Sequence, residues 1–381
     1  MTFSDEGSDF YRNKAMLAPM VRVGSLPLRM MALEYGADLV YSPEMVDKRV
    51  IGSTRVVNEV TGTIDYMKHG KINFQLHPDE KSRLVFQLGT ADPDLALEAI
   101  RTVAQDVVAV DVNSGCPKHF SISGGMGAAL MSDPERLCKI LRNLVENSGL
   151  PVTCKIRIFP SKEETIKLAQ LLASTGIKAL GVHCRTRDER PREPGHWDYF
   201  TDIVKALDIP VIANGDIFKY EDIARVKEMT NVSSVMIARG AQQNVSVFRK
   251  EGPIPIRDIM VQYIKTAVHI DNVFANTKYT LMQMLVEDTK SKEFKGLQKS
   301  KTHEQLCKEF DLEEFYIQAM AEREERTAFL ASKKAASEKE AVVEESDANL
   351  EKKRKMESSP EVSKKKAEPS TTISIQSNLP E

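Results

Sequence analysis

The sequence has no apolar run that approaches the roughly 18 residues of a membrane-spanning helix. Its opening stretch, MTFSDEGSDF, is polar and acidic, and it lacks the basic and apolar segments of a secretory signal peptide. The five cysteines include no Cys-x-x-Cys pair, which argues against a zinc site and against a disulfide framework. We therefore expect a protein of a reducing compartment, cytoplasmic with the nucleus as a second location, with no membrane partner and no metal.

The chain also lacks a strong charge of either sign. Its formal net charge is −2, so affinity for a polyanion would have to come from a local basic patch. With 41% hydrophobic and 28% charged residues, the composition is that of a soluble globular protein. The 381 residues are enough for one large domain and a smaller one.

The final part of the chain lacks aromatic residues. From residue 331 to 381 there is no Phe, Tyr or Trp, and Lys, Glu, Ser and Ala dominate. Such a segment cannot bury enough apolar surface to offset the entropy lost on ordering, so we predict a disordered C-terminal tail over 331–381. The tail contains EKKRK and SKKKAE, which are typical both of a nuclear-localisation signal and of a purely solvating tail.

Eight short runs of apolar and β-branched residues recur between residues 14 and 240, and amphipathic helical patterns separate most of them. Near-continuous apolar strands that alternate with helices indicate parallel strands buried on both faces. We predict an α/β fold, a (β/α)8 TIM barrel over residues 1–250, because eight such units suit a closed barrel better than an open doubly wound sheet. An extra hairpin is expected between residues 54 and 79, and a small all-α helical domain over 251–330. The eight runs are KAMLAPM, DLVYSPE, RLVFQLG, VVAVDVN, VTCKIRI, ALGVHCR, PVIANGD and SSVMIAR.

Polar residues mark the ends of these runs. In a barrel of this kind the active site lies at the carboxyl ends of the strands, where all eight ends meet. We therefore expect one polar mouth made by most of the strands. The residues at the ends, in chain order, are Pro19 and Met20, Glu44, Gln87, Asn113, Lys155 with Arg157, His183 with Arg185, Asn214-Gly215-Asp216, and Arg239-Gly240.

Each of these residues also has an ordinary structural interpretation. Of Lys155 and Arg157, we expect one to point into the mouth and the other outward, and we assign Lys155 to a ligand because an inward lysine without a partner is costly. His183 is either a core histidine or a ligand-binding residue. The glycine-bearing turns NGD and ARGAQ follow the seventh and eighth strands, where barrels often hold a phosphate on backbone N–H groups.

A phosphate site without a metal cluster, beside Gln, Lys and His side chains, suits a phosphorylated cofactor with an extended ring. FMN fits, because its ring needs hydrogen bonds along its edge and a positive charge near the electron-accepting side. Pyridoxal phosphate is an alternative that would also use the turns and a strand-end lysine, but it has less need of a Gln and an Asn.

Cys116 lies between a glycine and a proline on the turn after the fourth strand, which we expect to be exposed. A thiol with an ordinary pKa of about 8.5 is mostly protonated at neutral pH and can act as a general acid. The alternative, a buried structural cysteine, suits Cys138 or Cys154 better. Cys184 is expected to lie near the site as a spectator.

The chain resembles the tRNA-dihydrouridine synthases in eight ordered segments, and in particular the eukaryotic class that modifies position 20 of the D-loop. The resemblance spans about residues 14–250 and continues into NTKYTLMQML at 276–285. Its most specific part is an Asn-x-Gly-Cys-Pro core followed by Gly-Gly-Met-Gly. The segments are LAPMVRVGSLPLR, VVNEVTGTIDY, RLVFQLGT, VDVNSGCPKHFSISGGMGAALM, VTCKIRI, VHCRTRDERP, VIANGD and SSVMIARGA.

This resemblance implies a two-step cycle, in which NADPH reduces FMN and the reduced flavin passes hydride to C6 of uracil while a cysteine protonates C5. It makes Cys116 the proton donor, Asn113 a contact of the uracil, and Arg185 a contact of uracil or RNA. The chain departs from the family in having Cys184 where a glycine is common, which would place a thiol beside the flavin edge. The residues implied to hold FMN are Ala18, Pro19, Met20, Gln87, Lys155, His183, Asn214, Gly215, Asp216, Ala238 and Arg239.

A tRNA partner requires further contacts, because the target uridine must leave its stack. Residues 289–303, TKSKEFKGLQKSKTH, read as a Lys-rich loop between helices, and Lys295, Lys299 and Lys301 are candidates to bind the tRNA backbone. A merely solvated loop is the alternative. Two other functions stay open: an FMN barrel that reduces or oxidises a free pyrimidine, as a dihydroorotate dehydrogenase does, and a catalytically dead RNA-binding scaffold. We expect a monomer.

Overall fold

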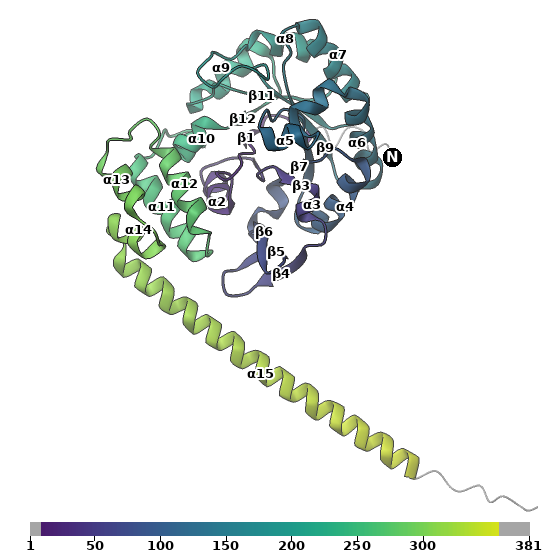
Figure 1. The fold of residues 1–381 in the computed structure, drawn as a ribbon, viewed down its shortest axis with the longest axis vertical. Coiled ribbons are helices and arrows are strands. Elements are labelled where there is room, and N and C mark those ends of the chain that lie inside the picture. Colours follow the sequence, from purple (N-terminus) through teal and green to yellow (C-terminus); the bar gives the residue numbers. More distant parts are fainter. Residues whose placement is uncertain (1–8, 358–381) are drawn as a thin grey trace, which may run out of the picture. The chain divides into compact units, whose positions relative to one another are not determined.

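A computed structural model describes residues 9–357 and contains a closed barrel of eight parallel strands (Figure 1). The barrel strands are β1 (Ala15–Leu17), β2 (Leu39–Tyr41), β7 (Leu84–Gly89), β8 (Ala109–Asn113), β9 (Val152–Arg157), β10 (Ala179–His183), β11 (Val211–Asn214) and β12 (Ser234–Ile237). The pairings of β1 with β12 and of β2 with β7 close the ring, and the short β3 (Met45–Val46) adds to the end of β7. The predicted TIM barrel is confirmed.

Side chains on alternate positions of each strand fill the barrel interior, because successive residues of a strand point to opposite faces. Near the amino ends of the strands this interior is an apolar cluster of its own, which includes Met16, Tyr41, Val85, Ala109 and Ile212. The same inward faces become polar toward the carboxyl ends. The mouth is therefore the polar end of a barrel whose other end is sealed.

Lys155 and Arg157 are two residues apart on β9 and therefore share a face. The expectation that they point in opposite directions is wrong. Arg157 Nε donates to the Gly115 carbonyl at 2.8 Å, and its Nη1 donates to the Thr186 carbonyl at 2.9 Å. Both cations thus belong to the mouth.

Helices cover the outside of the barrel, and three of them begin at side-chain caps. They are α2 (Leu26–Glu34), α3 (Asp47–Val50), α4 (Pro93–Val103), α5 (His119–Ser123), α6 (Pro134–Asn147), α7 (Lys162–Ala173), α8 (Asp198–Lys205), α9 (Tyr220–Thr230) and α10 (Arg239–Gln243), with 3-10 turns η1 (Pro78–Arg83), η2 (Ala104–Asp106), η3 (Gly127–Ser132) and η4 (Val245–Phe248). Asp92, Asp133 and Ser161 accept hydrogen bonds from first-turn N–H groups of α4, α6 and α7. Pro93 and Pro134 occupy first-turn positions, where a missing N–H leaves no bond unmade.

Between β3 and β7 the chain forms a three-stranded antiparallel sheet, so the expected hairpin is present with one further strand. Its strands are β4 (Thr54–Asn58), β5 (Thr63–Lys68) and β6 (Lys71–Leu76). Arg29 on α2 connects this sheet to the barrel: it donates to both carboxylate oxygens of Glu80, at 2.9 and 2.7 Å, and to the Gln75 carbonyl at 2.7 Å. Arg29 and Glu80 are each 1% exposed, so the ion pair is shielded from water.

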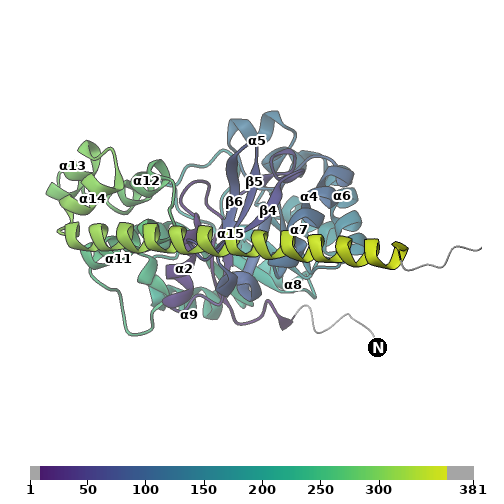
Figure 2. The same ribbon diagram turned by 90° about the horizontal axis from the view of Figure 1, so that it is seen from below.

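Four helices follow the barrel, α11 (Ile256–His269), α12 (Phe274–Met284), α13 (Lys292–Lys299) and α14 (His303–Glu309). Helices α11 and α12 contact α2 and α10, and the four lie on the side of the barrel away from α4 and α6 (Figures 1 and 2). The barrel and these helices form one compact unit that ends at Glu325. The predicted boundary at residue 250 as a division between domains stays a prediction.

The Lys-rich segment is not a loop. Most of it forms α13, where the Ser291 side chain caps the first turn and Phe294 and Leu297 are buried. The lysines recur at a spacing that leaves them exposed while the two apolar residues face inward, a helical pattern that their charge obscures in the sequence.

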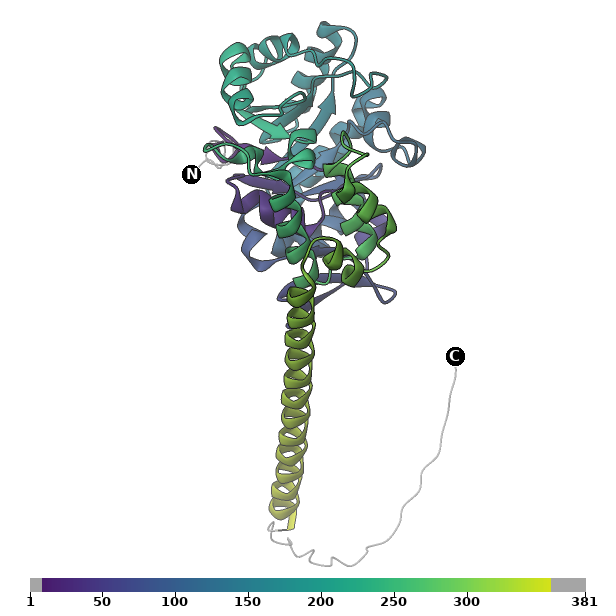
Figure 3. The ribbon, with the colours of Figure 1, turned by 90° about the vertical axis from the view of Figure 1, so that its left-hand side faces the viewer.

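The last helix, α15 (Glu313–Glu357), ends later than the composition predicts. It runs through residue 331, where we expected disorder to begin, and continues as a single long helix (Figure 3). Ala, Lys and Glu cannot build a core, but they are strong helix formers, so the same composition permits a solvated helix. Residues 358–381 lie outside the described residues. No helix in the described range is long and apolar enough to cross a membrane.

We expect Arg29→Ala to lower the free energy of unfolding by about 3–5 kcal/mol, because it leaves the Glu80 carboxylate buried without its cation. Urea denaturation followed by circular dichroism measures this change. Arg12→Ala removes an exposed ion pair with Asp9 and serves as the control, with an expected change within about 0.5 kcal/mol. Equal midpoints for both variants would show that the buried pair does not anchor the sheet.

Candidate active site

A cavity of about 350 Å³ lies at the carboxyl end of the barrel. This volume is in the range of small-molecule sites. Its wall combines strand-end residues with the loops that follow β8, β10, β11 and β12. The lining residues are Met20, Lys118, Arg157, His183, Arg185, Glu189, Pro191, Asn214, Gly215, Asp216, Ile217, Phe218, Met236, Ala238, Arg239 and Gln242.

The structure brings together most of the residues that the sequence places at the mouth. Those in the cavity wall are Met20, His183, Arg185, Asn214, Gly215, Asp216, Ala238 and Arg239. Gln87, Asn113, Lys155 and Cys116 come from the neighbouring strand ends but do not line this cavity, and Ala18 and Pro19 follow β1 beneath Met20. Lys295, Lys299 and Lys301 lie in and just after α13, also outside the wall. The binding roles given to all these residues stay predictions.

A chain of hydrogen bonds beside the cavity starts at Asp111 and ends at the cysteine loop. Asp111 is 1% exposed and accepts hydrogen bonds from Thr153 Oγ1 at 2.7 Å and Gln87 Nε2 at 2.8 Å. With its N–H used in this way, Gln87 presents its oxygen to Asn113 Nδ2 at 3.3 Å. The Asn113 oxygen in turn accepts the backbone N–H of Cys116 at 3.0 Å. Asn113 therefore holds the turn of the predicted proton donor.

This chain of bonds limits what Gln87 and Asn113 can offer to a ligand. The amide nitrogen and the amide oxygen of each side chain are both already engaged inside the protein. Burial raises the pKa of Asp111 to about 6, while the bonds from Gln87 and Thr153 oppose that rise. Sequence reasoning missed Asp111, although its position two residues before Asn113 on the same face was a usable signal.

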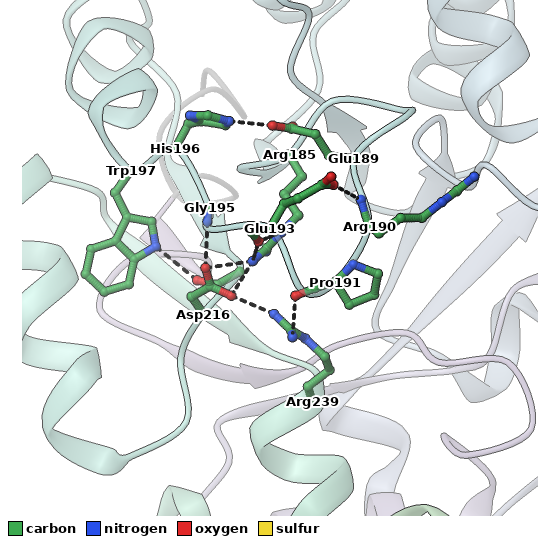
Figure 4. A network of polar contacts seen from close by, with 11 residues as sticks. Arg185, Glu189, Arg190, Pro191, Glu193, Gly195, His196, Trp197, Asp216 and Arg239 are labelled. Carbon is green, nitrogen blue, oxygen red and sulfur yellow. Dashed lines mark hydrogen bonds and ion pairs between the residues drawn. The ribbon is translucent and has the colours of Figure 1, made fainter. Parts of the chain in front are cut away.

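The turn after β11 is held by a second set of polar contacts (Figure 4). The Asp216 carboxylate accepts hydrogen bonds from Arg185 Nη2 at 2.6 and 2.7 Å, from Arg239 Nη2 at 2.5 Å and from the Gly195 N–H at 2.7 Å. Although burial alone would raise it, these donors hold the pKa of Asp216 below its usual value. The carboxylate is thus a fully engaged anion that fixes the turn, and only the backbone of Asp216 is left for a ligand.

Arg185 has a different environment from the one expected of an RNA contact. It is 2% exposed, and besides Asp216 it donates to the Glu193 carbonyl, with Nε at 2.8 Å. Its Nη1 is buried and has no hydrogen-bond partner among residues 9–357. A Cβ at Gly215 would lie 3.4 Å from this Nη1, so the unsatisfied N–H lies behind the same turn as Cys184.

Gly215 cannot carry a side chain at this turn. Its φ is +127°, and a Cβ would collide with Cys184 Sγ. Cys184 is fully buried behind the turn and does not line the cavity, and the implied position of its thiol beside the flavin edge stays a prediction. The cavity wall here is backbone, as the prediction of a phosphate turn requires.

Cations are crowded around the mouth. Burial and the nearby Arg157 lower the pKa of Lys155 to about 8. Burial and the charges of Lys155, Arg157, Arg185 and Arg239 hold the pKa of His183 well below 6.5, so the imidazole is neutral at pH 7. Cations that lower the pKa values of one another in this way mark a place where an anionic group would be stabilised. Residues 9–357 hold no group of three His, Cys, Asp or Glu side chains suited to a metal ion.

Cys116 is half-buried, which corrects the expectation of an exposed turn. Its carbonyl accepts the Ala128 N–H at 3.0 Å, so the Gly-rich segment that follows folds back onto the cysteine turn. Cys138, Cys154, Cys184 and Cys307 are all buried. Among the five cysteines, Cys116 alone is open to a substrate.

The family model for dihydrouridine synthase (Dus) matches residues 16–344. This chain belongs to the dihydrouridine synthase family. The resemblance drawn from eight sequence segments is thereby confirmed, and it extends through the helices that follow the barrel.

Three relatives of the Dus family illustrate the similarity. The chain is 44% identical over 315 residues to a tRNA-dihydrouridine(20) synthase of Schizosaccharomyces pombe, with 80% of this chain and 66% of that protein covered. It is 40% identical to the Saccharomyces cerevisiae enzyme of the same name, covering 72% and 78%, and 30% identical to a human tRNA-dihydrouridine(20a/20b) synthase-like protein, covering 72% and 83%. All three names specify NAD(P)+. The match spans just under two thirds of the S. pombe protein.

We expect Asp111→Asn to remove a pH dependence from the stability of the barrel. Because the pKa of Asp111 is raised to about 6 from about 3.9 in an unfolded chain, the native state binds more protons between these values. Wild-type stability should therefore fall by roughly 2–3 kcal/mol as pH rises from 4 to 6, and the variant should lack this fall. Urea unfolding at several pH values measures it. Asp94→Asn, on the exposed face of α4, should follow the wild-type curve.

Proposed function

We propose that this protein reduces a uridine of the tRNA D-loop, at position 20, to 5,6-dihydrouridine, using FMN and NADPH. The observation that carries the proposal is the Cys116 turn, positioned by Asn113 beside a cation-rich, glycine-lined cavity in a Dus-family barrel. The names of the two yeast relatives support the substrate and the position.

The residues of the mouth fit FMN. The backbone of Gly215 lines the cavity, which suits a phosphate held on backbone N–H groups. Lys155 supplies positive charge for an electron-rich ring edge. We infer that Lys155, His183, Asn214 and the backbone after β11 and β12 hold the cofactor. When bound and reduced by NADPH, FMN supplies the hydride for C6 of uracil.

The chain supplies the proton. In the proposed reaction the Cys116 S–H bond breaks, a bond from that proton to C5 of uracil forms, and the electron pair stays on sulfur as a thiolate. Burial raises the pKa of Cys116, so the thiol is protonated at neutral pH and ready to donate. The hydrogen bond from the Cys116 N–H to Asn113 holds the sulfur at the mouth during this step.

We expect the purified protein with FMN and NADPH to convert uridine to dihydrouridine in unmodified tRNA transcripts. Mass spectrometry of nuclease fragments identifies the position. Cys116→Ala should keep the reduction of FMN by NADPH, seen as loss of flavin absorbance, and should lose dihydrouridine by at least about a hundredfold, the usual worth of a general acid. Conversion of free uracil or dihydroorotate in place of tRNA would support the small-pyrimidine alternative. Absence of flavin binding would support a dead scaffold.

We expect Lys295→Ala, Lys299→Ala and Lys301→Ala in one variant to raise KM for tRNA severalfold and to flatten its salt dependence, because fewer counterions are released on binding. All three lysines are exposed. A charge-matched control replaces the exposed Lys139, Lys167 and Lys205 on α6, α7 and α8. Identical salt slopes for the two variants would make α13 an ordinary solvated surface.

A further inference from the structure

The Glu44 carboxyl group is buried beside the cysteine turn and is not explained by the fold. It follows β2 and is 8% exposed. Its Oε1 accepts a hydrogen bond from Ser121 Oγ at 3.1 Å, and Ser121 lies on α5, just after Cys116. Its Oε2 is buried without a hydrogen-bond partner in the described part of the chain. A half-satisfied buried carboxylate is costly, so its position calls for a functional reason.

Packing fixes the position of this carboxyl group. A Cβ at Gly89, the last residue of β7, would lie 2.7 Å from Glu44 Oε1 and 3.1 Å from its Cγ. The glycine therefore makes the space that the Glu44 side chain occupies. From the other side the fully buried Ser121 closes over it.

Ser121 brings Glu44 and Cys116 together: a Cβ at Gly127 would collide with Ser121 Oγ, which donates a hydrogen bond to Glu44, and would lie 3.1 Å from Cys116 Cβ. Burial and the negative charge of Glu44 both raise the pKa of Cys116. Burial also raises the pKa of Glu44, against the opposing contacts of Ser121 and Cys116. Glu44 and Cys116 thus belong to one cluster of acidic groups around Ser121.

Two groups on β9, the strand next to β8, carry positive charge. Lys155 and Arg157 on β9 interact with the sulfur and are themselves stabilised by a negative charge there. The Lys118 backbone also favours the thiolate. Cations beside a cysteine generally favour its thiolate, which is the nucleophilic form. A proton donor needs the opposite, a sulfur that keeps its proton.

We propose that Glu44 is a positioning residue for Cys116 that holds the sulfur in its S–H form at the mouth of the barrel, offsetting the cations of β9. This role rests on the proposed reduction of uridine. The negative carboxylate makes the thiolate unfavourable, so the proton stays on sulfur until it is transferred to C5 of the uracil. After each turnover the thiolate recovers a proton from water.

The test is the pH dependence of Cys116 alkylation by iodoacetamide, because the thiolate is the form that reacts. The full chain saturated with FMN is labelled between pH 7 and 10, and modification of Cys116 is read by peptide mass spectrometry. We expect Glu44→Gln to lower the midpoint by about one pH unit, which is roughly a tenfold increase in thiolate near neutral pH. Glu44→Asp, which keeps the charge, should remain nearer to the wild type.

The matched control is Asp47→Asn. Asp47 is also a buried acid of this segment, but its Oδ2 accepts from Thr90 Oγ1 at 2.7 Å and it has no part in the electrostatics of Cys116. Its replacement should leave the midpoint unchanged. An unchanged midpoint in Glu44→Gln overturns the proposal. So does a wild-type midpoint at or below the ordinary cysteine value of about 8.5, a measurement that needs no variant.

A second readout separates this proposal from the proposed function. In single turnovers of pre-reduced enzyme with tRNA, the rate should fall on the alkaline side as Cys116 loses its proton, and in Glu44→Gln this fall should begin about one pH unit lower with KM unchanged. If Glu44→Gln forms dihydrouridine and the alkaline limb of its pH–rate profile is not shifted, the role of Glu44 is overturned while the proposed reaction stands. A shifted alkylation midpoint without any dihydrouridine would leave the contact in place and overturn the reaction.

Discussion

The buried carboxylate of Asp111 fixes how the polar side chains at the mouth of this barrel are oriented. A charge inside a closed ring of strands must be hydrogen-bonded, and the donors come from the strands on either side, Gln87 on β7 and Thr153 on β9. Because Asp111 takes the N–H of Gln87, the orientation of the next amide is decided, and Asn113 must turn its oxygen toward the cysteine turn. The location of Cys116 is thus a consequence of satisfying one charge deeper in the barrel.

Around the cavity, positively charged side chains outnumber negatively charged ones. Cations from β9 and from the turns after β10 and β12 surround the cavity, and the Asp216 carboxylate is already engaged by Arg185 and Arg239 in fixing its own turn. The remaining charge of the cavity wall is therefore positive, and part of that wall is backbone. Such a wall is stable only because its members are partly neutral, as the lowered pKa of His183 shows, and an anionic ligand would relieve the repulsion.

The sequence predicts the parts of this arrangement that follow from strand alternation and topology. His183 and Asn214 are at inward strand ends, so their convergence follows once the barrel is assumed. It does not predict contacts that depend on how a loop folds back: the Gly195 N–H and Arg185 reach Asp216 only through the turn after β10, and Cys184 lies behind Gly215 for the same reason. Composition likewise shows whether a segment can form a hydrophobic core. It does not distinguish a solvated helix from disorder in α15.

The proposed role of Cys116 as proton donor agrees with these electrostatics. Histidine is a common general acid, but burial and four neighbouring cations hold the pKa of His183 well below its usual value, so the imidazole is neutral at neutral pH. Lys155 keeps a proton with a pKa of about 8, yet an anionic ring beside it would raise that pKa and hold the proton more firmly. Cys116 is the remaining group whose proton is retained by burial and by a neighbouring carboxylate, Glu44, while the cations across from it stabilise the thiolate once it forms. A thiol between opposite charges can both keep its proton at rest and release it when the carbanion of the reduced base arrives.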